Sequence, residues 1–253
     1  MLLLPAGNAS EWTGPTGTNT YLLAGRTTAL IDAGVGNPAH LAAIERGLEG
    51  RDLDLILLTH SHSDHMAGVP ALLERWPHVE IRSGAAPRPI EDGETIAAGD
   101  GTLRALHTPG HAPDHFCFAD AERREVYCGD LLRLGGTIVI PASRGGDLRA
   151  YLESLRRIRD LRARRLWPGH GPAIEEPEQL IAQYVAHREA REAQIVAALR
   201  QGHDTPAAIV AEVYGSLSPG LMAAAAESVL AHLKKLVEED VVETVEGRYG
   251  LRL

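Results

Sequence analysis

The chain has 253 residues, of which 44% are hydrophobic and 23% charged, proportions that are ordinary for a globular protein. Its formal net charge of −9 argues against a general binder of nucleic acid or of anionic membranes. No apolar run approaches the roughly 20 residues that a membrane span needs. The first residues lack the basic start of a signal peptide, and Cys117 and Cys128 form neither a CxxC motif nor a disulfide framework. We therefore expect a cytoplasmic protein with no membrane partner.

Up to about residue 174, the sequence predicts short apolar strands separated by glycine and proline turns, with a few helices between them. Strands are expected at 19–25, 27–34, 53–59, 79–84, 102–110, 115–120, 124–130 and from 164 onward, and helices at 38–50, 68–77 and about 147–162.

The last third of the chain has a different pattern. One long helix is predicted over 178–200, and a second begins at Thr205, which is a good N-cap and is followed by a proline. A third helix is expected over about 219–239, followed by a hairpin that turns at 246–247. Helices followed by a hairpin predict a small winged-helix-like unit at the C-terminal end.

Charge is distributed unevenly along the chain. Residues 175–253 carry 7 basic and 13 acidic side chains, a net charge of −6. Residues 144–165 contain 8 arginines and 3 acidic residues, a net charge of +5. We interpret the arginine-rich segment as a solvated helix face, with attraction of phosphate groups as the alternative.

Three histidines and an aspartate are crowded into the sequence THSHSDH at 59–65, directly after an apolar strand. His60 and His62 can hold one metal ion where the strand gives way to a loop, and Asp64 and His65 can turn toward a second ion. Neutral imidazole and carboxylate groups are common ligands of zinc and related divalent ions. A histidine-rich surface loop is the alternative, and it would need no partners elsewhere in the chain.

Three other strand ends each carry one ligand-type side chain next to a glycine. They are His111 in TPGH, Asp130 in GD and His170 in PGHG. Because this pattern recurs at four separate strand ends, coincidence is a poor explanation, and the sequence predicts a single metal centre assembled from all four.

These motifs, THSHSDH, TPGH, GD and PGHG, resemble those of the metallo-β-lactamase superfamily. The resemblance implies an α/β fold, the αββα sandwich, with the metals at one edge of two packed sheets. It also implies the ligands: a first zinc ion on His60, His62 and His111, a second on Asp64, His65 and His170, and Asp130 bridging both. Antibiotic-cleaving members use a cysteine at the second site where this chain offers Asp130, so the chain is more similar to the glyoxalase II and nuclease branches.

Nearly the whole chain is similar to the β-lactamase-like protein 2 family, through GTNTYLL at 17–23, QYVAHREAREAQI at 183–195 and HLKKLVEEDVV at 232–242. Members of that family carry a C-terminal winged-helix-like domain. The resemblance implies a catalytic domain over 1–174, a connecting helix over 175–202 and a winged-helix-like domain over 203–253. Characterised relatives include an endoribonuclease that acts on single-stranded RNA and thioesterases that release polyketide chains.

Three further residues are candidates for supporting roles around the ligands. Asp32 follows a strand, where a carboxylate can orient a ligand histidine or cap a turn. His115 comes four residues after His111 and can support the ligands, line the pocket or simply pack. Asn19 can face the mouth of the pocket or stabilise a local turn.

The expected chemistry is hydrolysis by two zinc ions, with manganese or iron as substitutes, that share one hydroxide. Asp64 and Asp130 are the expected catalytic carboxylates, and Asp130 would orient the hydroxide and accept its proton. Single-stranded RNA is the first expectation for the substrate, an acyl-thioester the second, and a β-lactam or another ester or amide the third.

A nucleic-acid-binding regulator with a structural metal belongs to a different functional class. It is disfavoured because structural zinc sites are closed and four-coordinate, whereas seven ligand-type residues leave room for water. The acidic C-terminal unit is expected to cap the pocket or to form the surface of a homodimer.

Overall fold

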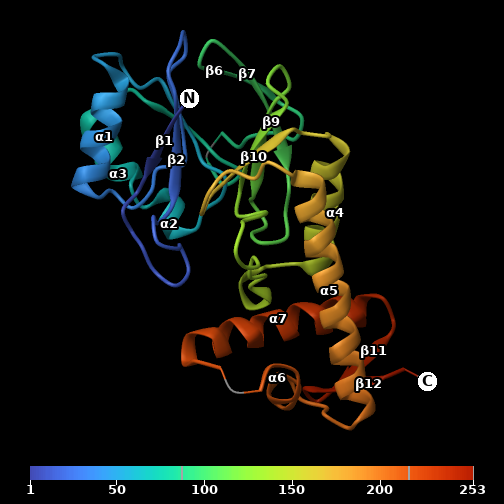
Figure 1. Cartoon of the computed structure of the whole chain (residues 1–253). Helices are drawn as coiled ribbons and strands as arrows, with labels where there is room; N and C mark the ends of the chain where they lie inside the picture. Colours follow the sequence, from blue (N-terminus) through green and yellow to red (C-terminus); the bar gives the residue numbers. More distant parts are fainter. Residues whose placement is uncertain (87, 216, 253) are drawn as a thin grey trace.

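The computed structural model describes residues 1–86, 88–215 and 217–252. Two five-stranded sheets pack face to face, and helices cover the outer face of each sheet (Figure 1). The α/β sandwich that the sequence predicts is therefore confirmed.

The first sheet has the strand order β1-β2-β3-β4-β5. Its register places Leu22, Leu30 and Ile56 in one row across three strands, and their side chains pack on the outer helices. Tyr21 and Ile31 alternate to the opposite face, toward the second sheet, because successive side chains on a strand point to opposite sides. The strands are β1 (Leu2–Pro5), β2 (Asn19–Leu23), β3 (Ala29–Ile31), β4 (Leu55–Leu57) and β5 (Glu80–Arg82), and the outer helices are α1 (Pro38–Leu48) and α3 (Val69–Arg75).

The second sheet has the order β10-β9-β8-β7-β6, in which only β9 and β10 run parallel. Leu103 and Phe118 face the first sheet, whereas Cys117 and Cys128 are buried against the helices on the outer side. The strands are β6 (Thr95–Ala98), β7 (Gly101–His107), β8 (Phe116–Asp120), β9 (Glu125–Gly129) and β10 (Arg165–Pro168), and the outer helices are α4 (Leu148–Asp160) and α5 (Pro177–Arg200).

Four short elements within the described residues differ from the sequence-based expectation, one of them a 3-10 turn, η1 (Ala142–Arg144). β1 and β6 were not predicted: β1 is an exposed edge strand of four residues, and β6 pairs with β7 through the tight turn at Gly99. A one-turn helix, α2 (Ser63–Met66), lies inside the histidine motif. Only one side chain of β1 and two of β6 are buried, and α2 is a single turn, so these elements carry little of the apolar pattern by which an element is recognised from sequence.

The C-terminal part packs around its own apolar cluster, which includes Ile195, Ile209, Val229 and Leu233. Thr205 caps its first helix as predicted, because the hydroxyl accepts a hydrogen bond from the backbone N–H of Ala208 at 3.3 Å. Its elements are α6 (Pro206–Tyr214), α7 (Pro219–Glu238), β11 (Val242–Val245) and β12 (Arg248–Leu251).

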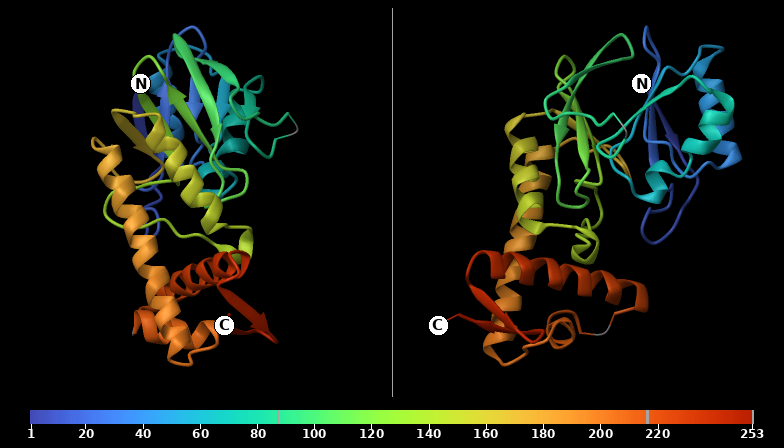
Figure 2. Two further views of the ribbon diagram at one scale, coloured as in Figure 1. Left: turned by 90° about the vertical axis from the view of Figure 1, so that its right-hand side faces the viewer. Right: turned by 180° about the vertical axis from the view of Figure 1, so that it is seen from behind.

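Helix α5 joins the two parts of the molecule, and both views in Figure 2 show it running from the sandwich to the C-terminal helices. Its first half contributes Leu180, Ile181 and Tyr184 to the cluster under the second sheet. Its second half contributes Ile195 and Leu199 to the C-terminal cluster. Within the described ranges, no helix combines the length and the apolar character needed to cross a bilayer.

Candidate metal centre

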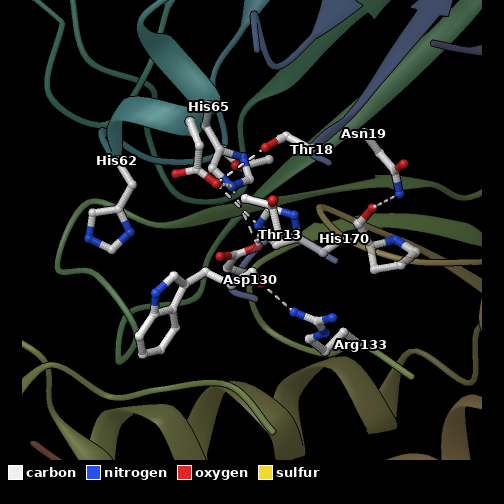
Figure 3. Close-up of polar contacts among 12 residues, drawn as sticks. Thr13, Thr18, Asn19, His62, His65, Asp130, Arg133 and His170 are labelled. Carbon is white, nitrogen blue, oxygen red and sulfur yellow. Dashed lines mark hydrogen bonds and ion pairs between the residues drawn. The ribbon is translucent and has the colours of Figure 1, made fainter. Parts of the chain in front are cut away.

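The seven predicted ligands lie together at one edge of the sandwich, each just beyond the end of a strand or in α2. His60 follows β4, His111 follows β7, and Asp130 and His170 follow the parallel strands β9 and β10. Figure 3 shows His65, Asp130 and His170 pointing toward one another. Three groups of these side chains have ligand atoms within 4.8 Å of one another: His60, His62 and His111; His60, His65 and Asp130; and Asp64, His65 and His170.

In the first group, three imidazole rings point at one place, and their nitrogens carry too few hydrogens for all of them to form hydrogen bonds with one another. Nδ1 of His62 lies 2.9 Å from Nε2 of His60 and 2.8 Å from Nε2 of His111. The other ring nitrogen of His111 lies 2.7 Å from the carbonyl oxygen of Val139, so it carries the proton and Nε2 is a lone pair. Nδ1 of His60 likewise donates to the hydroxyl of Thr59 at 3.0 Å, because that hydroxyl gives its own hydrogen to a carboxylate. Two lone pairs therefore face a ring nitrogen that can supply only one hydrogen.

In the second group, lone pairs and carboxylates face one another. Nδ1 of His65 donates to Asp32 at 2.8 Å, so Nε2 is the ring nitrogen of His65 that faces the other groups of the centre. That nitrogen lies 3.4 Å from an oxygen of Asp64 and 3.5 Å from Oδ1 of Asp130, and neither it nor Oδ1 has a hydrogen-bond partner. Nε2 of His170 lies 3.3 Å from the same two carboxylates. Negative charge and lone pairs are thus concentrated where only a positive charge would stabilise them.

The pKa values of these groups point the same way. Burial disfavours the charged form of His170, but the carboxylates of Asp130 and Asp64 outweigh it and raise the pKa of His170 to about 9. Burial also opposes ionisation of Asp130, yet His65 and His170 hold the pKa of that carboxyl well below its usual range. The carboxylates stabilise a cation at this place, and a divalent metal ion meets the same requirement as a proton. Imidazole nitrogen and carboxylate oxygen form a donor set that fits zinc, iron or manganese.

Asp130 connects the two groups. Its Oδ1 faces His65 and His170, and its Oδ2 lies 3.6 Å from Nε2 of His111. The backbone N–H of Asp130 donates to Nε2 of His115 at 3.1 Å. One carboxylate therefore has an oxygen directed at each group.

The three supporting candidates are all buried behind the ligands. Asp32 accepts hydrogen bonds from the backbone and hydroxyl of Thr59 and from His65. Burial lowers the pKa of His115 to about 3, so its ring is neutral; Nδ1 donates to the Thr108 hydroxyl at 2.9 Å. Asn19 is 2% exposed.

The amide of Asn19 ties down the loop that carries His170. Its Nδ2 donates to the carbonyls of Pro168 at 3.0 Å and Gly171 at 2.8 Å, on either side of that histidine. The local turn that the sequence suggested is not what this amide stabilises. The loop partner lies about 150 residues away in the sequence, so no local signal could have identified it.

Thr18 and Thr59 contact the centre although the sequence analysis assigned them no role. The hydroxyl of Thr18 donates to Oδ2 of Asp64 at 3.2 Å, and Thr59 links Asp32 to His60. Thr18 lies in the motif GTNTYLL, and Thr59 lies in the motif THSHSDH. Their positions at a strand end and beside a ligand are the features of the sequence that could have identified them.

The arginine-rich segment is mostly neutralised by carboxylates. Arg157 pairs with Asp92 at 2.8 Å, Arg164 with Glu125 at 2.6 Å and Arg165 with Glu175 at 2.8 Å. Arg164 and Arg165 lie at the start of β10, whereas His170 follows its end. The ion pairs leave little free positive charge for phosphate groups in these three side chains.

The chain matches two family models, one over the sandwich and one over the C-terminal part. Residues 13–88 and 83–170 match the Metallo-beta-lactamase superfamily, and residues 205–249 match the Beta-lactamase associated winged helix domain. The chain belongs to the metallo-beta-lactamase superfamily. This assignment confirms the predicted fold class and makes the chain a hydrolase of that superfamily.

Individual members of the superfamily agree with the family resemblance. The chain is 32% identical to the Beta-lactamase-like protein 2 homolog of Caenorhabditis elegans, over 90% of this chain and 81% of the relative. It is 36% identical to the Atrochrysone carboxyl ACP thioesterase of Aspergillus chevalieri, over 79% of this chain and 69% of that one. The solved structure of TTHA1623 in a di-iron-bound form is 31% identical, with a TM-score of 0.56, and the match covers 68% of this chain and 95% of the other.

Proposed function

We propose that this superfamily member is a two-metal hydrolase. One ion would be held by His60, His62 and His111, and the other by Asp64, His65 and His170, with Asp130 directed at both. The observation that carries this proposal is the convergence of unshared lone pairs and carboxylates in two groups linked by a single carboxylate. The di-iron-bound relative supports two ions. Zinc is the first choice of metal, with iron or manganese as substitutes.

When bound, divalent ions of this kind activate a water molecule as the nucleophile and polarise the bond that it attacks. The residues of the chain would orient this water molecule and receive its proton. Oδ1 of Asp130 has no hydrogen-bond partner, which supports a role for this carboxylate as the acceptor of the water's proton. The hydroxyl of Thr18 holds Asp64, and His115 holds the backbone N–H of Asp130, so both proposed catalytic carboxylates are fixed before substrate arrives.

We propose an acyl-thioester as the substrate, which reverses the order favoured by the sequence. A relative that is 36% identical is named as a thioesterase that acts on an acyl carrier protein. Three of the arginines that could attract RNA, Arg157, Arg164 and Arg165, are paired with carboxylates. The two lysines of α7 are occupied as well: Lys234 pairs with Asp147, and Lys235 with Glu192 and Glu239. A thiolate is also a good leaving group that needs no phosphate-binding surface.

We further propose that Asp32 orients His65, that His115 fixes Asp130, and that Asn19 holds the His170 loop. The proposed division of the chain is a catalytic domain over 1–174, a connecting helix over 175–202 and a winged-helix-like domain over 203–253. The two apolar clusters that share α5 support this division.

The metal content tests the first part of the proposal. Protein that is stripped with a chelator, reconstituted with zinc and freed of excess metal should contain two zinc ions per chain by elemental analysis. One ion or none would contradict the two-metal centre, whatever the substrate is.

A parallel turnover assay tests the substrate. Zinc-loaded protein is incubated with an acyl-thioester of N-acetylcysteamine, an acyl-coenzyme A, a single-stranded RNA and a chromogenic β-lactam, and the variant Asp130→Asn is the control for contaminating enzymes. We expect thioester hydrolysis that the variant lacks. Cleavage of RNA without thioester turnover would reassign the substrate to RNA, and turnover of the β-lactam alone would do the same for β-lactams.

A further inference from the structure

Helix α5 carries an arginine that is buried without an acidic partner. Arg188 is 4% exposed, and in the described part of the chain no carboxylate forms an ion pair with it. Its guanidinium donates to the hydroxyl of Thr137 at 3.1 Å and to the carbonyl oxygen of Ile138, and it lies 5.4 Å from the ring centre of Tyr151. Its Nε has no hydrogen-bond partner.

This placement is energetically unfavourable for stability alone. Moving a guanidinium out of water costs free energy that neutral acceptors and an aromatic face only partly offset. An apolar side chain of similar volume would fill the same space without that cost. Arginine also keeps its charge at any physiological pH, so it cannot escape the cost by losing a proton. The position therefore calls for a role that an apolar residue cannot perform.

Arg188 binds Thr137 and Ile138, and these two residues come immediately before Val139, which contacts the proposed metal ligand His111. Thr137 and Ile138 lead into Val139, whose carbonyl oxygen lies 2.7 Å from Nδ1 of His111. That hydrogen bond keeps the proton on Nδ1 and directs Nε2 of His111 toward His62. A shift of the backbone at residue 138 would move the Val139 carbonyl and turn the His111 ring.

The rest of the segment is held by side chains of the same helices. The hydroxyl of Tyr184 in α5 donates to the carbonyl of Arg133 at 2.8 Å, and the hydroxyl of Tyr151 in α4 donates to that of Leu131 at 2.7 Å. The segment between Asp130 and α4 contains no strand or α-helix, only a 3-10 turn at Ala142–Arg144, so side-chain contacts of this kind help to determine its course. Arg188 binds the carbonyl of Ile138, the residue that directly precedes Val139.

We propose that Arg188 is a positioning residue for His111, acting through the carbonyls of Ile138 and Val139. The inference rests on the proposed function, in which His111 is a metal ligand. It gives α5 a second task besides joining the two parts of the molecule, because the same helix sets the geometry of the first metal group.

Arg191 provides a matched control on the same helix. It lies three residues further on, its Nε is also buried without a partner, and it stacks 3.9 Å from the ring centre of Tyr214. Its guanidinium donates to the carbonyl of Val213 at 3.4 Å, in α6, and not to the segment next to His111. Arg191 is half-buried, so it is less enclosed than Arg188. Its replacement removes an arginine stacked on a tyrosine of the same fold region without touching the proposed path.

The experiment compares Arg188→Met, Arg188→Lys and Arg191→Met with the wild type. Zinc dissociation constants are measured by competition with a chromophoric chelator, and the visible spectrum of the cobalt(II)-loaded protein reports ligand geometry. Loss of an outer contact to a ligand histidine typically weakens metal binding by about 10–100-fold. We expect Arg188→Met to weaken one of the two zinc sites by about 10-fold and alter the cobalt spectrum, with the melting temperature of the metal-free protein close to wild type. Arg188→Lys should fall between, and Arg191→Met should match the wild type.

Wild-type zinc affinity and cobalt spectrum in Arg188→Met would overturn the inference while leaving the proposed function intact. An equal loss in Arg191→Met would also overturn it, because the effect would then be a general one of α5. If Arg188→Met does not fold, unchanged zinc affinity in the folded Arg188→Lys variant is the outcome that counts against the inference. Failure of the wild type itself to bind zinc would remove the proposed function, and this inference with it.

Discussion

At the scale of single residues, the metal centre depends on which nitrogen of each histidine carries its hydrogen. Val139, Asp32 and Thr59 each accept a hydrogen bond from the outer ring nitrogen of a proposed ligand. The inner nitrogen is thereby left as a lone pair directed at its neighbours. The hydrogen-bond acceptors behind the ligands therefore matter as much to the site as the ligands themselves.

The charge of Asp130 should be essential. Asp130→Asn keeps the shape of the side chain but removes the negative charge that faces both groups and raises the pKa of His170. We expect the variant to fold, to bind less zinc and to turn over substrate at least about 100-fold more slowly, measured as kcat alongside elemental analysis.

A suitable control for that change is Asp120→Asn. Asp120 is also buried, but it ends β8, which runs antiparallel to β9, and it pairs with Arg123. Its replacement should leave kcat unchanged. Full zinc content and wild-type turnover in Asp130→Asn would show that Asp130 is assigned the wrong role.

The stability of the metal-free protein should fall as pH rises. His170 has an ordinary pKa of 6.5 that the folded protein raises to about 9, so the folded state holds this proton more tightly than the unfolded state. The resulting stabilisation is complete below pH 6.5 and is lost as pH rises through about 9. The pKa of His65 is raised for a related reason, so it acts in the same direction.

Thermal unfolding of chelator-treated protein between pH 6 and 9.5 measures this effect. Around pH 6.5 the buried histidines of lowered pKa, such as His60, His62 and His115, act in the opposite direction, because they bind a proton only when the chain unfolds. The melting temperature should therefore decline across the window from about 7.5 to about 9, and saturating zinc should abolish the decline because the ion replaces the proton. A metal-free melting temperature that is constant or rises across this window is incompatible with the charge arrangement described here.

At the scale of elements, the site depends on how closely β9, β10 and α2 approach. The backbone N–H of Gly169 donates to the carbonyl of Gly129 at 2.8 Å, which continues the parallel β9–β10 pair into the two ligand loops. A Cβ atom at Gly169 would lie 2.6 Å from Oδ1 of Asp130 and 2.7 Å from Cε1 of His65. This glycine is required for lack of space between ligands and not for its backbone conformation, since its φ is not in the left-handed region.

Gly169→Ala should therefore damage the second metal group selectively. Overpacking of this kind costs about 1–3 kcal/mol, and the methyl group would displace the Asp130 carboxylate or the His65 ring. We expect loss of one zinc ion per chain and at least about 10-fold lower kcat, with a folded protein by circular dichroism. Gly101→Ala, where a Cβ would meet nothing within 4 Å, is the control and should behave as wild type. Two zinc ions and normal kcat in Gly169→Ala would mean that these loops are further apart than described.

At the scale of the whole molecule, the C-terminal unit contacts the segment that follows Asp130. The acidic C-terminal part contacts the sandwich through α7: Glu227 accepts from the backbone and hydroxyl of Ser143, and Lys234 pairs with Asp147, the N-cap of α4. These contacts support a role in bracing the segment that follows Asp130. The homodimer and the cytoplasmic location that the sequence suggests stay predictions, which light scattering and cell fractionation can test.

Replacing Arg156, Arg157, Arg164 and Arg165 with alanine separates the two substrate classes. Because three of these arginines already pair with carboxylates, the KM for an acyl-thioester should change less than about twofold at both low and moderate ionic strength. The melting temperature should fall, since Glu125 is buried and loses two arginine partners. A KM for RNA that rises strongly in the variant and with added salt would instead indicate a polyanion held by this segment.

Much of the fold and nearly all of the candidate site could be predicted from the sequence. Strand ends followed by a glycine and a ligand-type residue are local patterns, and so are the Thr205 cap and the long helix that became α5. Each depends on residues within about a dozen positions of one another, where propensity and spacing act directly. The family resemblance then grouped His60, His62 and His111 apart from Asp64, His65 and His170, and the structure brings the same sets together.

Only the tertiary structure decided which distant groups meet. Asn19 holds a loop about 150 residues away, and Arg188 holds the segment beside His111 from 50 residues away. The carboxylates that neutralise Arg157 and Arg164 come from other strands and loops. Such pairs depend on how the sheets and helices pack, and this packing depends on the apolar pattern of the whole chain. The spacing of residues along the sequence therefore does not predict them. The residue types of this sequence determined the chemistry that is available, and the packing of two sheets determined which lone pairs, carboxylates and arginines are placed where that chemistry can occur.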